Sequence, residues 1–375
     1  MTREILLKEV ISFVRLSVFI IQCWPLPENA SRLRVVCVKL YHCACIMILA
    51  SLSAALIYTV VNNIKNVVVL ANIIIITSAT FHANFNFLFY NINYHHLQKV
   101  TFEMERFSNS IKPHEGIVIQ RYIVKCVPFY ALCVFVFYFM TSLTVVLPPV
   151  KQQPFPTIAE YPFDVLYQPV RTLIYAQQTI SGFLVTGQLC LNVFMALLIW
   201  FASIRFEMLI EELKTATNAY QLFECIRKHQ ELLEYGNDVS IATRPFAFIT
   251  ICCSTTCTIT IFLLLLKEHS IIFAMWFIGL SVAGLIEVFM YTWPAEHLIH
   301  SITEVGYTAF EIFEKHYFVK IWKCLQIFIM RNQKPIIIRI PCLMPALSFN
   351  YFAAYLSTIL SYFTTLRVVM IDDAE

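Results

Sequence analysis

Long apolar runs separated by short polar stretches make up most of this chain. Seven of the runs supply the ~20 mostly apolar residues that a helix needs to cross the ~30 Å hydrocarbon core of a bilayer. The pattern therefore predicts an all-α polytopic membrane protein with seven transmembrane helices. Their expected ranges are 36–60, 67–90, 122–147, 172–202, 246–266, 270–296 and 346–369.

Apolar residues recur at helical spacing outside these spans as well. The run from Val10 to Ile21 is too short to cross a bilayer and contains Arg15, so we expect an amphipathic helix at the membrane surface rather than a signal peptide. The segments 203–240 and 300–335 are half apolar in the same way. We expect them to be helices that bury their apolar faces against each other and between neighbouring subunits.

Composition supports a membrane protein and excludes a soluble one. Of 375 residues, 59% are hydrophobic and only 14% are charged, with a mean hydropathy of +0.69. The net charge of +3 does not indicate nucleic acid as a partner, because basic residues in such a chain mark the side of the membrane on which a loop lies. Membrane lipids are the expected surroundings.

The basic residues predict the orientation. Of 27 Lys and Arg residues, 22 fall in the N-terminal segment and in the second, fourth and sixth loops, and 5 fall in the other loops and the C-terminal end. The positive-inside rule therefore predicts a cytosolic N-terminus and an extracellular C-terminus, the reverse of a G-protein-coupled receptor. On the outer side, six prolines in the loop 148–171 exclude a regular helix and predict a stiff lid over the outer ends of the third and fourth spans.

This topology divides the chain into six parts along its length. They are a cytosolic N-terminal segment (1–34), helices one to four (35–202), a cytosolic helical extension (203–245), helices five and six (246–299), a cytosolic anchor helix (300–340), and the last transmembrane helix with a short extracellular tail (341–375).

Enzyme chemistry is not indicated by any motif. The sequence has no nucleophile elbow, no phosphate-binding glycine loop and no HExxH, so we expect neither catalysis nor a cofactor. His297 and His300 have a spacing that suits a shared metal, but no third ligand is evident, and we interpret them as surface or packing residues. Glu287 lies within the sixth span, where a carboxylate is a functional candidate by default, although snorkelling or pairing with a neighbouring helix explains it as well.

Cysteines and glycosylation follow the same topology. None of the thirteen cysteines lies in a loop assigned to the outside, so we expect no structural disulfide. The triplet Asn29-Ala30-Ser31 is on the cytosolic side and should carry no glycan.

The last span, "LSTILSYFTTLRVVM", has an unusual pattern of hydroxyl-bearing residues. Thr358, Ser361, Thr365 and Val368 recur at spacings that place them on one helical face. Such hydroxyls often bond to other helices or to their own backbone. Five hydroxyl-bearing residues within nine positions exceed what packing requires, and the pattern is typical of a helix that faces lipid on one side and water on the other.

Five strings, in order along the chain, make the sequence resemble the insect odorant receptors. They are "WP" at Trp24, "YPFD" from Tyr161 to Asp164, "KHQELL" from Lys228 to Leu233, "MRNQKP" from Met330 to Pro335, and "LSFNYFAAYLSTILSYFTTLR" in the last helix. One departure is "YTAFEIFEKHY", where Phe310 and Glu314 stand at positions at which the family usually has Tyr and Trp. The related gustatory receptors usually end the last helix in Gln-Phe rather than "TTLR".

The resemblance implies a function and a site. Members form ligand-gated cation channels with an olfactory co-receptor in the plasma membrane of olfactory neuron dendrites, as four subunits around one pore lined by their last helices. Carried over by motif, Thr365 lies at the hydrophobic constriction, with Ser361 one turn inward, Val368 one turn outward and Thr358 further in. We expect the following Asp372, Asp373 and Glu375 to concentrate cations at the outer mouth.

The expected ligand is a small volatile organic molecule in a pocket among the outer halves of spans two, three, four and six. Aromatic residues with a few hydroxyls suit such a ligand. The expected residues are Ser78, Phe81, Phe135, Tyr138, Tyr175, Thr179, Phe183, Trp276 and Leu280. A gustatory-receptor-like channel is the alternative function, and a metabotropic receptor or a transporter fits the charge distribution less well.

Overall fold

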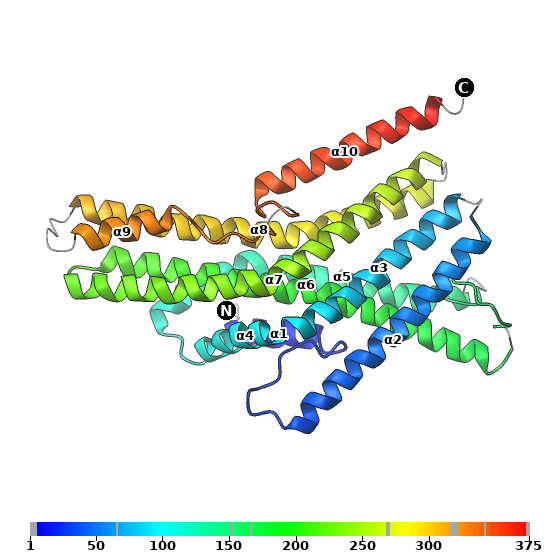
Figure 1. Ribbon diagram of the computed structural model, residues 1–375, viewed down its shortest axis with the longest axis horizontal. Coiled ribbons are helices and arrows are strands. Elements are labelled where there is room, and N and C mark those ends of the chain that lie inside the picture. The colour runs from blue at the N-terminus through cyan, green and yellow to red at the C-terminus, as the bar shows by residue number, and fades with distance from the viewer. Residues whose placement is uncertain are drawn as a thin grey trace, which may run out of the picture.

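A computed structural model describes residues 6–64, 67–150, 153–165, 167–267, 271–315, 322–340 and 343–372. Within these ranges the chain is helical, and the only strand-like pairing is a single bridge between Ile340 and Met344 (Figure 1). The helices are α1 (Leu7–Ser17), α2 (Arg32–Asn62), α3 (Val67–Ile92), α4 (Tyr94–Ser108), α5 (Pro113–Val150), α6 (Val170–Thr215), α7 (Ala219–Lys267), α8 (Ile271–Lys315), α9 (Trp322–Asn332) and α10 (Phe349–Asp372).

The predicted transmembrane helices are present in the structure. Among the described residues, six helices are long and apolar enough to cross a membrane, and they are α2, α3, α5, α6, α7 and α8. The seventh predicted span coincides with α10, which is 24 residues long but is not among those six. It contains several hydroxyl-bearing side chains and Arg367. The all-helical membrane fold is thus confirmed.

α6 is the centre of the molecule. It contacts α5, α7 and α8 extensively, and it also contacts α1, α2, α3 and α4. Its aromatic side chains Phe194, Phe201 and Phe206 are fully buried. The middle of this helix is apolar on nearly all sides, and a helix with such a sequence is buried by the rest of the chain.

The amphipathic N-terminal helix is confirmed as α1, but it lies closer to the N-terminus than the predicted run 10–21. The chain leaves the helix after Ser17, and Gln22 has a φ of 52°. The buried face, which includes Leu7, Val10 and Val14, packs on α5 and α6 rather than facing the membrane alone.

The long cytosolic extensions that we predicted are helical. α6 continues to Thr215, α7 begins at Ala219 and α8 continues to Lys315, so all three extend well beyond the apolar spans at the end of the molecule where α9 lies (Figure 1). We call this region the anchor bundle and define it as residues 203–215, 219–240, 300–315 and α9.

Ion pairs join the segments that the charge count assigns to one side of the membrane. Lys99 Nζ of α4 lies 2.6 Å from Asp238 Oδ2 of α7, and Arg205 of α6 lies 3.5 Å from Glu103 of α4. Arg121 of α5 pairs with Glu207 of α6 at 2.7 Å, and Lys228 of α7 pairs with Glu212 of α6 at 2.6 Å. The structure therefore brings the second and fourth loops together at one end.

The proline-rich loop between α5 and α6 is irregular over its described residues, and it also contacts α2 and α3, which was not predicted from the sequence. The Glu160 N–H donates to Thr59 Oγ1 of α2 at 2.7 Å, and the Glu160 carboxylate accepts bonds from the amides of Asn62 and Asn63. Ala159 packs against a small apolar cluster of α2 and α3. The Thr157 N–H also donates to Gln178 Oε1 of α6 at 2.9 Å, so the described part of the loop contacts the ends of α2 and α3 and the start of α6.

Candidate functional site

α10 is attached to the molecule along one face only. In Figure 1 it leans away from the other helices, and its main contacts are with α7 and α8. Tyr355 and Ile359 are buried in this contact, and the Phe363 ring lies 4.9 Å from the Phe262 ring of α7. Phe363 therefore lies on the side of α10 that faces α7.

The four predicted pore residues lie on the uncovered side of α10. Thr358, Ser361, Thr365 and Val368 are all exposed, whereas Tyr355 and Ile359 on the adjoining face are buried.

The hydroxyls of this stripe bond within their own helix. Thr358 Oγ1 donates to the Ala354 carbonyl at 2.8 Å, and Thr365 Oγ1 donates to the Ser361 carbonyl at 2.9 Å. Each hydroxyl therefore satisfies its proton locally and leaves its oxygen available on the exposed surface. The acidic residues Asp373 and Glu375 lie outside the described residues, as does the side chain of Asp372.

A small hydroxyl cluster joins α10 to the rest of the bundle. The Tyr355 hydroxyl lies 3.3 Å from Ser254 Oγ and accepts a bond from Thr255 Oγ1 at 3.4 Å. Ser254 in turn donates to the Gly284 carbonyl of α8 at 2.7 Å. A Cβ at Gly284 would lie only 3.0 Å from Ser254 Oγ, so the small residue permits this close approach. We call Ser254, Thr255, Gly284 and Tyr355 the tyrosine joint.

Several predicted ligand residues face the interior but contact different helices. Ser78 is buried and its hydroxyl lies 3.5 Å from the Cys253 carbonyl of α7. Tyr138 of α5 donates to the Ser17 carbonyl at 2.7 Å, and Tyr175 of α6 donates to the Val145 carbonyl of α5 at 2.5 Å.

The remaining predicted ligand residues divide between the interior and the surface. Phe183 is partly buried, and Leu280 packs on an apolar cluster formed by α3, α7 and α8. Phe81 and Phe135 are 43% and 64% exposed and stack on neighbours of their own helices. The side chain of Trp276 lies outside the described part of the structure. The structure thus distributes these residues over several interfaces.

Three buried hydroxyls in this region have no hydrogen-bond partner among the described protein atoms. Thr179 of α6 belongs to the predicted ligand residues, whereas Thr77 of α3 and Ser281 of α8 do not, although they adjoin Ser78 and Leu280. A hydroxyl within an apolar run was the available signal. Such groups remain able to bond to a ligand that carries a polar atom.

Contacts between the helices place these hydroxyls at comparable depth. The Gln177 amide of α6 donates to Ser51 Oγ of α2 at 2.9 Å, and Ser53 of α2 bonds to Thr80 of α3. Through α2, these two bonds place Thr179 of α6 near the depth of Thr77 of α3. The bonds of Ser78 to α7 and of Ser254 to Gly284 relate α3 to α8 in the same way.

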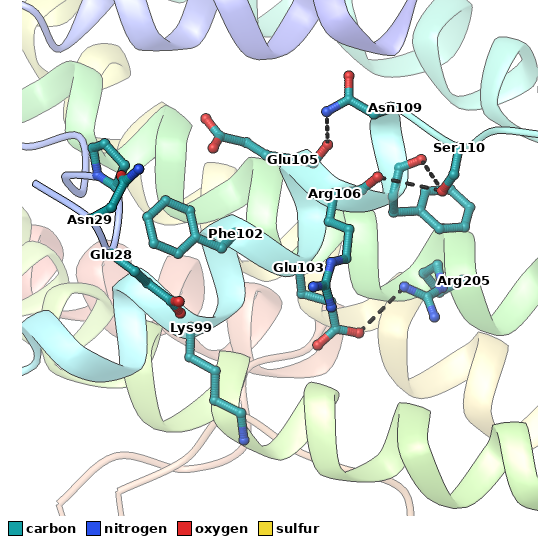
Figure 2. A pocket seen from close by; sticks show the side chains of 12 residues that line it. Glu28, Asn29, Lys99, Phe102, Glu103, Glu105, Arg106, Asn109, Ser110 and Arg205 are labelled. Carbon is teal, nitrogen blue, oxygen red and sulfur yellow. Dashed lines mark hydrogen bonds and ion pairs between the residues drawn. The ribbon is translucent and has the colours of Figure 1, made fainter.

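A large polar cavity lies elsewhere and has the wrong character for a volatile ligand. It is open to the surface and has a volume of about 950 Å³ between Pro27–Asn29, α4 and Arg205 of α6 (Figure 2). Glu28, Lys99, Glu103, Glu105 and Arg106 also line it, and Figure 2 shows the Glu103–Arg205 pair crossing it. Small apolar molecules prefer mostly apolar pockets, so we do not assign the ligand to this cavity.

Two of the recognised strings meet inside the anchor bundle. His229 of "KHQELL" lies with its Nε2 2.9 Å from Asn332 Oδ1 of "MRNQKP". The Asn332 amide donates to the Phe328 carbonyl, so its oxygen is the acceptor, and His229 donates. Burial lowers the pKa of His229 to about 4, which keeps the ring neutral at physiological pH. This contact holds α9 against α7 outside the predicted span 246–266.

Comparisons with known proteins agree with this architecture. A family described as 7tm Odorant receptor matches residues 59–360. The structure of the insect olfactory receptor OR5 from Machilis hrabei is 15% identical, with a TM-score of 0.79 over 96% of this chain and 98% of that chain. Its complex with eugenol is 16% identical, with a TM-score of 0.79 over 97% and 98% of the two chains. At this identity the structures show the shared fold alone.

A search of curated proteins finds no match. The family match covers most of the chain, and the family consists of receptors and not enzymes. On this evidence the chain belongs to the 7tm odorant receptor family.

Proposed function

We propose that this chain is the odorant-binding subunit of a heteromeric, ligand-gated, non-selective cation channel that detects small volatile organic molecules. Its partner is an olfactory co-receptor in a heterotetramer, and its location is the plasma membrane of olfactory sensory neurons, in their dendrites. The anchor bundle and the N-terminus face the cytosol, and the end of α10 faces outward.

The observation that carries the proposal is the uncovered hydroxyl-bearing face of α10. A lone membrane helix gains nothing from a row of Thr358, Ser361 and Thr365 directed away from its own bundle. The same row becomes favourable when several copies of the helix surround water, because hydroxyls hydrate and apolar neighbours such as Val368 narrow the path. In this arrangement Thr365 contributes to the gate.

The ligand assignment rests on the region where Thr77, Thr179 and Ser281 retain unpartnered hydroxyls. Aromatic residues of the predicted set lie on the same helices, and together they suit a small molecule with one or two polar atoms. The OR5 structure with eugenol supports a ligand of this size in a related fold.

Assembly is supported by the surface of the anchor bundle. Large apolar side chains are exposed there, outside the predicted spans, where lipid does not cover them. They are Tyr220, Phe223, Tyr307, Ile327 and Met330. The charge count places this part of the protein in the cytosol, where exposed apolar side chains are unfavourable. Contacts between subunits would remove these side chains from water.

The test is expression with and without an olfactory co-receptor, followed by current recording with a panel of volatiles. We expect odorant-evoked cation current only in the co-expressing cells, and recovery of the receptor from detergent as a larger assembly. Epitope tags at each terminus should place the N-terminus inside. Second-messenger signals without current, or an external N-terminus, would instead indicate a metabotropic receptor.

A further inference from the structure

A chain of polar side chains crosses the apolar interior where α3, α6, α7 and α8 meet. His82 Nε2 of α3 lies 3.1 Å from Thr250 Oγ1 of α7, which lies 3.2 Å from Asn192 Oδ1 of α6. The Tyr291 hydroxyl of α8 donates to the same Asn192 oxygen at 2.9 Å. Each of these four residues is at most 4% exposed. This polar crossing lies within four of the predicted membrane spans.

Three amide side chains next to this row of polar residues have buried polar atoms without a hydrogen-bond partner among the described protein atoms. Both polar atoms of Asn86 and of Gln188, and the Nδ2 of Asn192, are buried without a hydrogen bond to any described protein atom. Asn86 and Gln188 are 0% and 1% exposed. The Cys23 thiol lies near Gln188, but a thiol is a weak hydrogen-bonding group and forms no bond of normal geometry with it.

Helical spacing directs these amides toward the same crossing. Asn86 follows His82 by four residues on α3, and Gln188 precedes Asn192 by four residues on α6, so each amide shares a face with a member of the chain. α3 contacts both α6 and α7. The unpaired groups therefore adjoin the hydrogen-bonded chain and do not face lipid.

Leaving these groups unpaired is costly in a membrane protein. A buried polar atom without a partner loses its hydration and gains nothing in return, and the hydrocarbon around the bundle offers no substitute. Bound water is the usual partner of such groups in protein interiors, where one molecule commonly makes about three hydrogen bonds.

The chemistry of the unpaired atoms selects the ligand. Three are amide nitrogens, which donate, and two are amide oxygens, which accept. A metal cation satisfies only oxygens, and an apolar odorant satisfies neither. We propose that ordered water molecules occupy the polar crossing and bridge Asn86, Gln188 and Asn192. This site is independent of the proposed odorant and channel function.

Radiolytic hydroxyl-radical footprinting of the purified receptor tests the proposal, because X-rays generate radicals from tightly bound water in place. Tyr291, bonded to Asn192, is the probe. Tyr235 is the matched control: it is 3% exposed, and its hydroxyl donates to the Val100 carbonyl away from the crossing. We expect several-fold more oxidation of Tyr291 than of Tyr235.

Apolar replacements sharpen the result. Asn86→Leu and Gln188→Met keep the size of the side chains but remove the groups that hold water, so oxidation of Tyr291 should fall toward that of Tyr235. Equal, low oxidation of both tyrosines in the unmodified receptor would show a dry crossing and overturn the proposal, whether or not the variants fold. Oxidation of Tyr291 that is suppressed by sodium ions would also overturn it, in favour of a cation.

Discussion

α6 and α10 are both long helices of one chain, but they occupy opposite environments. α6 is surrounded on nearly every side by the other helices, and Phe194, Phe201 and Phe206 are fully buried. α10 buries only Tyr355 and Ile359 among its described side chains, while Leu360 is 59% exposed. The partners of α6 are thus encoded in the same chain, whereas most of the described surface of α10 is not covered by it.

The comparison also separates two kinds of polar residue. Asn192 of α6 bonds to Thr250 and Tyr291 and holds the interior together. Thr358 and Thr365 of α10 bond only to their own backbone and hold nothing together within one subunit. Asn192 therefore serves the fold, whereas Thr358 and Thr365 are free to serve function.

The largest expected effect is on the core side of the comparison. Phe201→Ala in α6 should destabilise the receptor by about 3–5 kcal/mol, because it leaves a cavity in a fully packed core. Leu360→Ala in α10 should change stability by less than about 0.5 kcal/mol. Thermal unfolding in detergent with size-exclusion detection measures both. Similar losses in the two variants would remove the distinction between the helices.

The second largest loss of stability is expected at the contact that holds α9 against α7. Asn332→Ala leaves the buried His229 ring without its acceptor, which should cost about 1–3 kcal/mol. A double-mutant cycle with His229→Phe should show coupling between the two positions. Additive effects would mean that the His229–Asn332 bond contributes nothing.

The same contact predicts a direction of pH dependence. The pKa of His229 falls from its ordinary 6.5 to about 4 in the folded receptor, because burial disfavours the charged ring. The unfolded chain binds the proton first, so this contribution to stability is lost as the pH falls from about 6.5 to about 4. The thermal unfolding temperature should therefore fall less on acidification in His229→Phe than in the unmodified receptor.

The tyrosine joint links the two environments, and its loss should have a moderate effect on gating. Tyr355→Phe removes the bonds to Ser254 and Thr255, worth about 0.5–1.5 kcal/mol. We expect the odorant concentration for half-maximal current to shift by up to about tenfold, with the ranking of odorants unchanged. Tyr362→Phe, on an exposed side chain, is the matched control. A changed odorant ranking would place Tyr355 in the ligand pocket instead.

The smallest effect is expected at an unpartnered hydroxyl. Thr179→Val should leave stability nearly unchanged, because no protein bond is lost. It should lower sensitivity by roughly fivefold for odorants with a polar group and leave purely apolar odorants unaffected, since one neutral hydrogen bond contributes about 1 kcal/mol. Equal losses for both classes would indicate a packing defect rather than a lost bond.

Much of the fold followed from the sequence, because apolar runs of membrane length and half-apolar extensions are compatible with few architectures. The position at which α1 ends could not be predicted from the sequence, since the turn after Ser17 depends on packing against α5 and α6. The docking of the proline-rich loop on α2 depends on Glu160 and Thr59, which lie far apart in sequence.

The site was less accessible to prediction than the fold. Helical spacing identified the stripe on α10, because a face is a local property. The contact of His229 with Asn332 spans 103 positions, and no local pattern reveals it. The depth and direction of a side chain depend on how the helices cross, which is why the sequence did not reveal that Phe135 is 64% exposed or that Ser281 is buried.

The central claim is that the uncovered face of α10 lines water in the assembled channel. Single cysteines at 361, 365 and 368 test it most directly, with cysteines at 359 and 363, on the side that packs against the bundle, as controls and the unmodified receptor as the background for its native cysteines. We predict that a water-soluble thiol reagent alters the odorant-evoked current at the first three positions and much less at the two controls. Equal modification at all five positions, or none at 361, 365 and 368, would contradict the claim.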